Sequence, residues 1–121
     1  MKKPIILTTS KADKLFSVWI RNRDGNKCLR CGSTEYLTCS HFWPRVKSVT
    51  RFAPDNCITL CYWKCHTDSK KGWEHAKQGE YRDYMIKRLG EERYKELEQL
   101  YYQSHMTREE AIKEFMNWYE I

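Results

Sequence analysis

The sequence has no long run of apolar residues and few residues that break regular structure, with only 5 glycines and 3 prolines among 121 residues. A membrane-spanning helix needs roughly 20 consecutive apolar residues, and no segment approaches that length. Lys2 and Lys3 are followed by an apolar block at residues 5–7 only, whereas the apolar region of a signal peptide needs about 7 to 15 residues. We therefore expect a soluble, cytoplasmic protein with no membrane partner.

No segment rich in Gly, Pro or Ser divides the chain, and no internal repeat is present. A chain of 121 residues fits one domain. We predict a single α+β domain over residues 1–121. It would comprise an N-terminal helix over 10–24, a central core over 25–75 and a helical extension over 80–121.

The charge is basic, with 22 Lys and Arg residues against 16 Asp and Glu residues and a formal net charge of +6. Such a balance favours an anionic partner, most commonly nucleic acid. The alternative is a solvated surface without a polyanionic partner, and charge alone does not decide between them.

Residue patterns predict the elements that flank the core. Apolar residues recur at helical spacing after Ser10, which we expect to cap the first helix, and Asp24-Gly25 should end it. Aromatic and β-branched residues predict strands over 36–43 and 57–60. Later apolar stripes, and a capping box formed by Thr107 and Glu110, predict helices whose stripes pack into the core. The stripes comprise Tyr81, Tyr84, Met85 and Leu89, then Tyr94, Leu97, Leu100 and Tyr101, then Ile112, Phe115, Met116 and Tyr119.

Six cysteines in a cytoplasmic chain point to metal ligation or burial rather than to disulfides. Two pairs, Cys28-x2-Cys31 and Cys61-x3-Cys65, can surround one tetrahedral structural Zn²⁺. Cys57 offers a rival partner for Cys61 at the same spacing. We interpret Cys39 and Cys57 as small buried residues of the two strands. The alternative is that all the cysteines are reduced and buried without metal.

His41, Asn56 and His66 are interleaved with the cysteine pairs. A neutral imidazole can accept a proton from water, and a second imidazole can hold a divalent cation against a phosphodiester. An Asn side chain can bond backbone groups across a hairpin loop and so orient the base. From chemistry alone, a structural role for each histidine stays equally open.

The combined motifs at residues 28–31, 40–45, 51–61 and 64–66 resemble those of HNH endonucleases with an embedded zinc site. They are more similar still to the phage recombination nuclease group typified by lambda NinG (Rap), whose helix before the first cysteine pair is matched by residues 20–24. The resemblance implies a ββα-metal (HNH, or His-Me finger) core and DNA cleavage that depends on Mg²⁺ or Mn²⁺. It also implies a preference for branched or recombination intermediates and, for a phage protein, location in the host cytoplasm.

By position, the resemblance assigns the general base to His41, loop orientation to Asn56 and a catalytic-cation ligand to His66. Two departures from the family pattern stand out. Ser40 occupies the place where many HNH enzymes carry an acidic metal ligand, although NinG-like members often have Gly there. The x3 spacing of the second cysteine pair also differs from the usual x2. The second cation ligand is left unassigned, with Asp55, Asp68 and His75 as candidates.

Basic residues near the hairpin suit contacts with DNA phosphates, which position a protein without reading sequence. The predicted DNA-binding residues are Arg45, Lys47, Arg51, Lys70 and Lys71. Trp43 or Trp63 could stack on or wedge into a distorted step, although packing around the zinc is the preferred interpretation.

Two other functions compete with the endonuclease. A non-catalytic zinc-finger module that binds DNA or protein would share the thiolate pairs and the basic surface, but it would not need His41 and His66 to converge on a second site. A toxin or homing-type HNH nuclease is less favoured, because a toxin usually ends a longer chain and this one reads as complete. A homodimer, built on the C-terminal helices, would suit cleavage of two strands at a junction.

Overall fold

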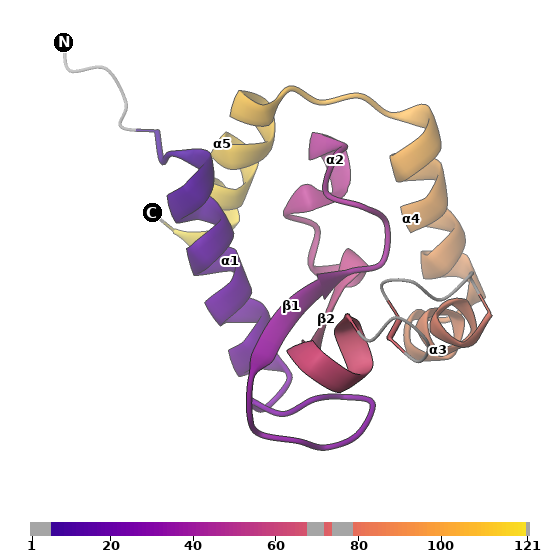
Figure 1. Cartoon of the computed structure of the whole chain (residues 1–121). Coiled ribbons are helices and arrows are strands. Elements are labelled where there is room, and N and C mark those ends of the chain that lie inside the picture. Colours follow the sequence, from indigo (N-terminus) through magenta and orange to yellow (C-terminus); the bar gives the residue numbers. More distant parts are fainter. Residues whose placement is uncertain (1–5, 68–71, 74–78, 121) are drawn as a thin grey trace, which may run out of the picture.

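The computed structural model describes residues 6–67, 72–73 and 79–120. The helices and strands of this part of the chain are arranged around a small hairpin (Figure 1). In chain order they are α1 (Thr9–Arg23), β1 (Leu37–His41), α2 (Ser48–Arg51), the 3₁₀ turn η1 (Pro54–Asn56), β2 (Cys57–Cys61), the short π-helical segment η2 (Tyr62–His66), α3 (Glu80–Leu89), α4 (Glu91–Gln103) and α5 (Arg108–Tyr119).

The two strands pair antiparallel, in a register that runs from Leu37 opposite Cys61 to His41 opposite Cys57. Successive side chains of a strand point to opposite faces of the sheet. His41 therefore faces α1, where its ring lies 6.1 Å from that of Phe16. Ser40 faces the other way and hydrogen-bonds Tyr81 of α3.

Each face of the hairpin is covered by its own set of helices, with α1 and α5 on one side and α3 and α4 on the other (Figure 1). On the first side Cys57 packs with Phe16 and other residues of α1 and α5. On the second side Ile58 and Leu60 pack with Tyr81 and other residues of α3 and α4. All five residues of β2 are buried, because both faces of this strand are covered.

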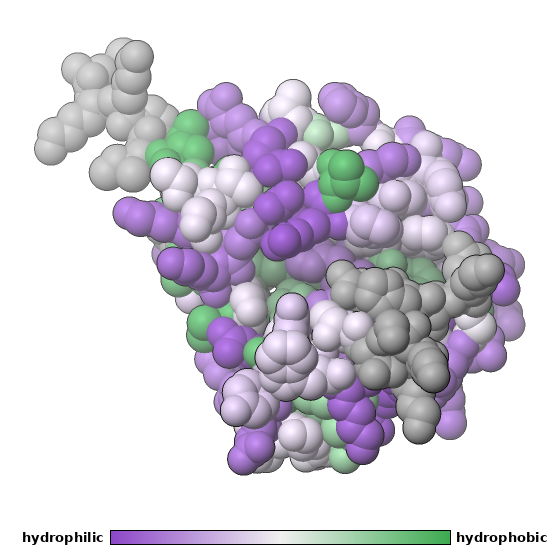
Figure 2. Space-filling model, viewed as in Figure 1, coloured by the Kyte–Doolittle hydropathy of each residue, from purple (hydrophilic) through white to green (hydrophobic). Residues whose placement is uncertain are grey.

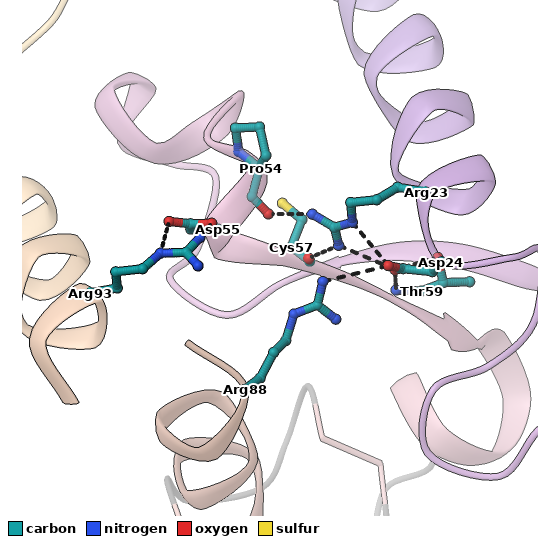
Figure 3. A network of polar contacts seen from close by, with 8 residues as sticks. All are labelled: Arg23, Asp24, Pro54, Asp55, Cys57, Thr59, Arg88 and Arg93. Carbon is teal, nitrogen blue, oxygen red and sulfur yellow. Dashed lines mark hydrogen bonds and ion pairs between the residues drawn. The ribbon is translucent and has the colours of Figure 1, made fainter. Parts of the chain in front are cut away.

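A polar network joins the end of α1 to β2 (Figure 3). The guanidinium of Arg23 donates to the backbone carbonyls of Pro54 at 2.8 Å and Cys57 at 2.6 Å. The same side chain pairs with Asp24, which accepts from the backbone and hydroxyl of Thr59 at 2.9 and 3.0 Å. The Arg-Asp pair at residues 23–24 thus docks α1 against the hairpin.

Asp24 is buried and ionised. Burial alone would raise the pKa of its carboxyl, but the hydrogen bond and charge of Arg23, together with the bonds from Thr59, outweigh burial and hold the pKa below its ordinary value. Arg88 of α3 approaches the same carboxylate at 3.6 Å. Asp24 therefore connects α1, β2 and α3.

The predicted first helix is confirmed, but its cap is Thr8 rather than Ser10, since the Thr8 hydroxyl accepts from the backbone N–H of Lys11. Asp24 ends this helix as expected, and Gly25 follows with φ 77°. The first strand is shorter than the predicted 36–43. Tyr36 has φ 53°, a left-handed conformation that cannot continue a strand.

The C-terminal helices match their predicted stripes. Met85, Leu97 and Phe115 are among the buried residues that the stripes contribute. Thr107 and Glu110 form the predicted capping box at the start of α5. Core packing is therefore confirmed as the role of these stripes.

The α+β class is confirmed, with one two-stranded sheet among helices. Only the short segment η2 directly follows β2, and the ββα-metal assignment and the single domain over 1–121 stay predictions. In the described part of the chain, no helix combines the length and the apolar character needed to cross a membrane.

Candidate functional site

Four cysteine sulfurs converge at one end of the hairpin. The Sγ atoms of Cys28, Cys31, Cys61 and Cys65 all lie within 4.8 Å of one another, and those of Cys31 and Cys61 are 3.7 Å apart. Tetrahedral Zn²⁺ with Zn–S bonds of about 2.3 Å would place its sulfur ligands roughly 3.8 Å apart. A disulfide needs sulfurs about 2.05 Å apart, so these are free thiols. The group could hold a structural metal such as zinc.

The turn between α1 and β1 shapes the first half of this cluster. Gly32, at φ 82°, closes the turn by donating to the carbonyl of Cys28, and the backbone N–H of Cys31 lies 3.5 Å from the Cys28 sulfur. Burial would raise the pKa of Cys28, but backbone N–H groups of Cys31, Cys61 and Arg30 lower it to about 7. This turn favours a thiolate at Cys28.

The second half of the cluster comes from the end of β2 and from η2. Burial and the neighbouring thiols raise the pKa of Cys65, because additional negative charge at this cluster is unfavourable. A cation among the four sulfurs would remove that conflict. The four cysteines predicted as ligands are thus brought together, and their chemistry fits the metal.

Cys57, the alternative partner of Cys61, lies outside the four-cysteine cluster. Cys57 is fully buried at the other end of the hairpin, where its sulfur groups with Cys39 and His41 instead of with Cys61. The burial predicted for Cys57 is confirmed, whereas Cys39 is only half-buried.

His41 is held by a backbone carbonyl. Its Nε2 lies 2.9 Å from the carbonyl oxygen of Arg51, and since a carbonyl only accepts, Nε2 carries the proton. Burial lowers the pKa of His41 to about 4, with the charge of Arg45 acting in the same direction. The imidazole is therefore neutral at neutral pH, and Nδ1 keeps its lone pair.

Asn56 organises the loop that supplies that carbonyl. It is fully buried, and its Oδ1 accepts from the backbone N–H of Trp43 at 2.8 Å. Its Nδ2 donates to the carbonyls of Trp43 and Thr50 at 2.9 and 3.2 Å. The side chain thus ties both ends of the loop between β1 and β2, including the residue before Arg51.

A pocket of about 240 Å³ opens beside His41, between α1 and β1. Arg21 and Arg45 line it together with Asp13, which is paired with Arg51 at 2.6 Å. Figure 2 shows a group of hydrophilic side chains between the positions of α1 and α2. Asp13, Ser17 and Arg21 line this pocket and are spaced four residues apart, next to the buried Ala12, Phe16 and Ile20 of the same helix. Sequence reasoning missed Asp13 and Arg21 as site residues, although this helical spacing could have indicated them.

His66 lies on the other face of the hairpin. The hydroxyl of Thr38 donates to the carbonyl of Leu60 at 2.8 Å, so it accepts from Nδ1–H of His66 at 2.9 Å. Because Thr38 and His41 are three residues apart on β1, they point to opposite faces. The structure therefore does not bring the side chains of His41 and His66 to one centre.

Ser40, which stands where many HNH enzymes carry an acidic ligand, and the candidate ligand Asp55 each have another bonding partner, and the other two candidates lie outside the described residues. The hydroxyl of Ser40 is buried and bonded to that of Tyr81 at 2.9 Å. Asp55 forms an ion pair with Arg93 of α4 (Figure 3). Asp68 and His75 lie outside the described residues.

The basic residues predicted to bind DNA have different surroundings. Arg45 is exposed at the pocket, while the guanidinium of Arg51 binds both carboxylate oxygens of Asp13. The ammonium of Lys47 lies over the ring of Tyr101, 4.2 Å from its centroid. Lys70 and Lys71 lie outside the described residues.

The two tryptophans considered for contacts with DNA differ in burial. Trp43 is buried and stacks on Tyr101 with a centroid distance of 4.8 Å, so it serves packing. Trp63 is 66% exposed on η2.

No curated protein and no solved structure matches the chain. The family model described as Bacteriophage Lambda NinG protein matches residues 2–120. This confirms the predicted resemblance to the NinG group, while the HNH assignment stays a prediction. Because the match covers nearly the whole sequence, the chain belongs to the bacteriophage lambda NinG protein family.

Proposed function

We propose that the chain is a DNA endonuclease in which His41 accepts a proton from the water that attacks a phosphodiester. The water oxygen bonds to phosphorus, the bond to the leaving strand oxygen breaks, and that oxygen takes a proton from solvent. The family suggests a recombination-related function in a bacteriophage, so branched DNA intermediates are the proposed substrates beside duplex DNA.

The observation that carries this proposal is the hydrogen bond from His41 to the Arg51 carbonyl. A general base at neutral pH must be neutral and must present a lone pair. The bond at Nε2 selects the tautomer whose acceptor is Nδ1, and burial keeps the ring neutral. Asn56 supports this arrangement by holding the loop that carries Arg51.

The pocket beside His41 suits a phosphate. Arg21 and Arg45 reach it from α1 and from the loop after β1. A guanidinium can bind phosphate oxygens through two parallel hydrogen bonds. The negative charge of Asp13 is compensated by Arg51, which leaves a positive balance at the pocket.

Two metals belong to the proposal. The four cysteines would hold Zn²⁺, which would stabilise the fold and take no part in the reaction. Mg²⁺ or Mn²⁺ would stabilise the charge of the phosphoryl group when bound, and the resemblance assigns its ligand to His66. Because His66 lies on the other face of the hairpin from His41, this role requires His66 to move toward the pocket. Among the described residues, neither group of three or more suitable ligands includes His66.

A second candidate is a zinc-bearing DNA-binding module without catalysis. The observation that favours it is the separation of His41 and His66 by the hairpin. Such a module would use the same cysteines and the same basic pocket.

Cleavage assays separate the two candidates. Labelled duplex and four-way-junction DNA would be incubated with wild type, His41→Ala and the control His105→Ala, with and without Mg²⁺ or Mn²⁺. His105 is exposed between α4 and α5. We expect cation-dependent cleavage by wild type and His105→Ala, and a loss of about 10²- to 10⁴-fold in His41→Ala with its zinc retained. DNA binding without cleavage under every cation would favour the module.

A further inference from the structure

A second group of metal-ligating side chains lies at the end of the hairpin opposite the four-cysteine cluster. One ring nitrogen of His41 and the sulfurs of Cys39 and Cys57 all lie within 4.8 Å of one another. The strand register explains this convergence. Cys39 and His41 are two residues apart on β1 and share a face, and Cys57 is paired directly with His41.

The histidine of this group is oriented in the manner of a metal ligand. Histidines that bind metals usually donate their second ring N–H to a carboxylate or a backbone carbonyl, which sets the tautomer and the ring direction. His41 donates from Nε2 to the Arg51 carbonyl at 2.9 Å. The lone pair on Nδ1 is thus the one available to an ion.

The surroundings of the group favour a site with one open position. Cys57 is fully buried, whereas Cys39 and His41 are half-buried and line the pocket that also contains Arg21 and Arg45. With three protein ligands, the fourth coordination position of a tetrahedral ion would face this pocket. Two sulfurs and one imidazole select thiophilic ions such as Zn²⁺, Cd²⁺ or Cu⁺ over Mg²⁺.

We propose that Cys39, His41 and Cys57 form a second metal site, specific for thiophilic ions and distinct from the four-cysteine cluster. On binding, the ion replaces the two thiol protons, which pass to solvent, and no oxidation occurs. One consequence rests on the proposed function. The ion occupies the lone pair that His41 uses as a base, so thiophilic ions inhibit DNA cleavage.

The test counts ions by native mass spectrometry while Cd²⁺ or Zn²⁺ is added to the full chain. We expect two bound ions per wild-type chain and one for Cys39→Ser, whose half-buried position tolerates the change. His41→Gln, which keeps both thiols, should also lose the second ion. The control Ser17→Ala changes another residue of the pocket wall and should keep two ions.

Co²⁺ provides a second readout, because sulfur-to-cobalt absorption at the second equivalent should be present in wild type and absent in Cys39→Ser. A single ion in wild type, or two ions in Cys39→Ser, would overturn the proposal. The count does not depend on cleavage, so it stands even if the chain never cuts DNA. If wild type cuts DNA yet binds one ion, the second site fails and the proposed function stands.

Discussion

The Nε2 atom of His41 lies 2.9 Å from the carbonyl oxygen of Arg51, while the guanidinium of the same Arg51 binds Asp13 of α1 at 2.6 Å. One residue thus orients the imidazole through its backbone and fixes the loop to α1 through its side chain. Because Asn56 holds the loop at Thr50, the direction of His41 depends on groups from both α1 and the loop.

Asn56→Ala should destabilise the fold and misplace the loop. The substitution leaves the backbone N–H of Trp43 and the carbonyls of Trp43 and Thr50 without their partner in a buried site. An unsatisfied buried group costs about 1–3 kcal/mol, so the free energy of unfolding should fall by at least that amount. Urea denaturation measures the change, with the exposed Asn117→Ala as control. Equal stability of the two variants would contradict the role given to Asn56.

Arg21→Ala and Arg45→Ala should each weaken DNA binding and its dependence on salt. Each lost phosphate contact should lower the slope of log K against log salt by about 1, uniformly across DNA sequences. Fluorescence anisotropy at several salt concentrations measures this slope. Lys95→Ala, an exposed change on α4, should leave it unaltered. A slope that is unchanged in the two arginine variants would exclude the pocket as a phosphate site.

Removal of the structural metal should lower the free energy of unfolding of the chain. The exposed Cys31 can be replaced by Ser without leaving a cavity, but the four-cysteine cluster then loses one ligand. An ion bound at 1,000 times its Kd stabilises a fold by about 4 kcal/mol, and Cys31→Ser or a strong chelator should forfeit most of this. Thermal unfolding with metal analysis measures this change, with the exposed Thr34→Ala of the same loop as the control. If neither the chelator nor Cys31→Ser lowers the Tm, no structural metal is bound.

The stability of the fold should depend on pH through Asp24. Its pKa is lower in the folded chain than in the unfolded chain, so its ionised form stabilises the fold above the unfolded value of about 3.9. That contribution is lost as pH falls through the folded pKa. Asp24→Asn should cost about 1.5–3 kcal/mol at neutral pH, the usual worth of a charged hydrogen bond. In Asp24→Asn the free energy of unfolding should also fall less steeply as the pH is lowered.

Urea unfolding of wild type and Asp24→Asn should be measured from pH 7 down to the lowest pH at which wild type is still folded. Glu114→Gln, an exposed change on α5, controls for the loss of one charge. If wild type and Asp24→Asn lose stability in parallel on acidification, Asp24 does not carry the effect.

Local sequence was enough to determine several parts of this protein. The capping box at Thr107 and the end of α1 at Asp24 each depend on residues within a few positions of one another. The spacing of Cys28 and Cys31 likewise indicates that both can bind one metal ion. The spacing of Cys61 and Cys65 indicates the same for the second pair. For these features the deciding contacts are close along the chain, so residue patterns predict them.

The tertiary structure decided which side chains meet. The register that places His41 opposite Cys57 also places it on the face of α1, with Cys39, and away from His66 on the other face. A shift of one residue would exchange the two faces, and nothing in the local pattern determines that choice. The docking of α1 then brings Arg21 and Asp13 to the same pocket. These contacts join segments 16 or more positions apart, and packing and strand pairing alone determine them.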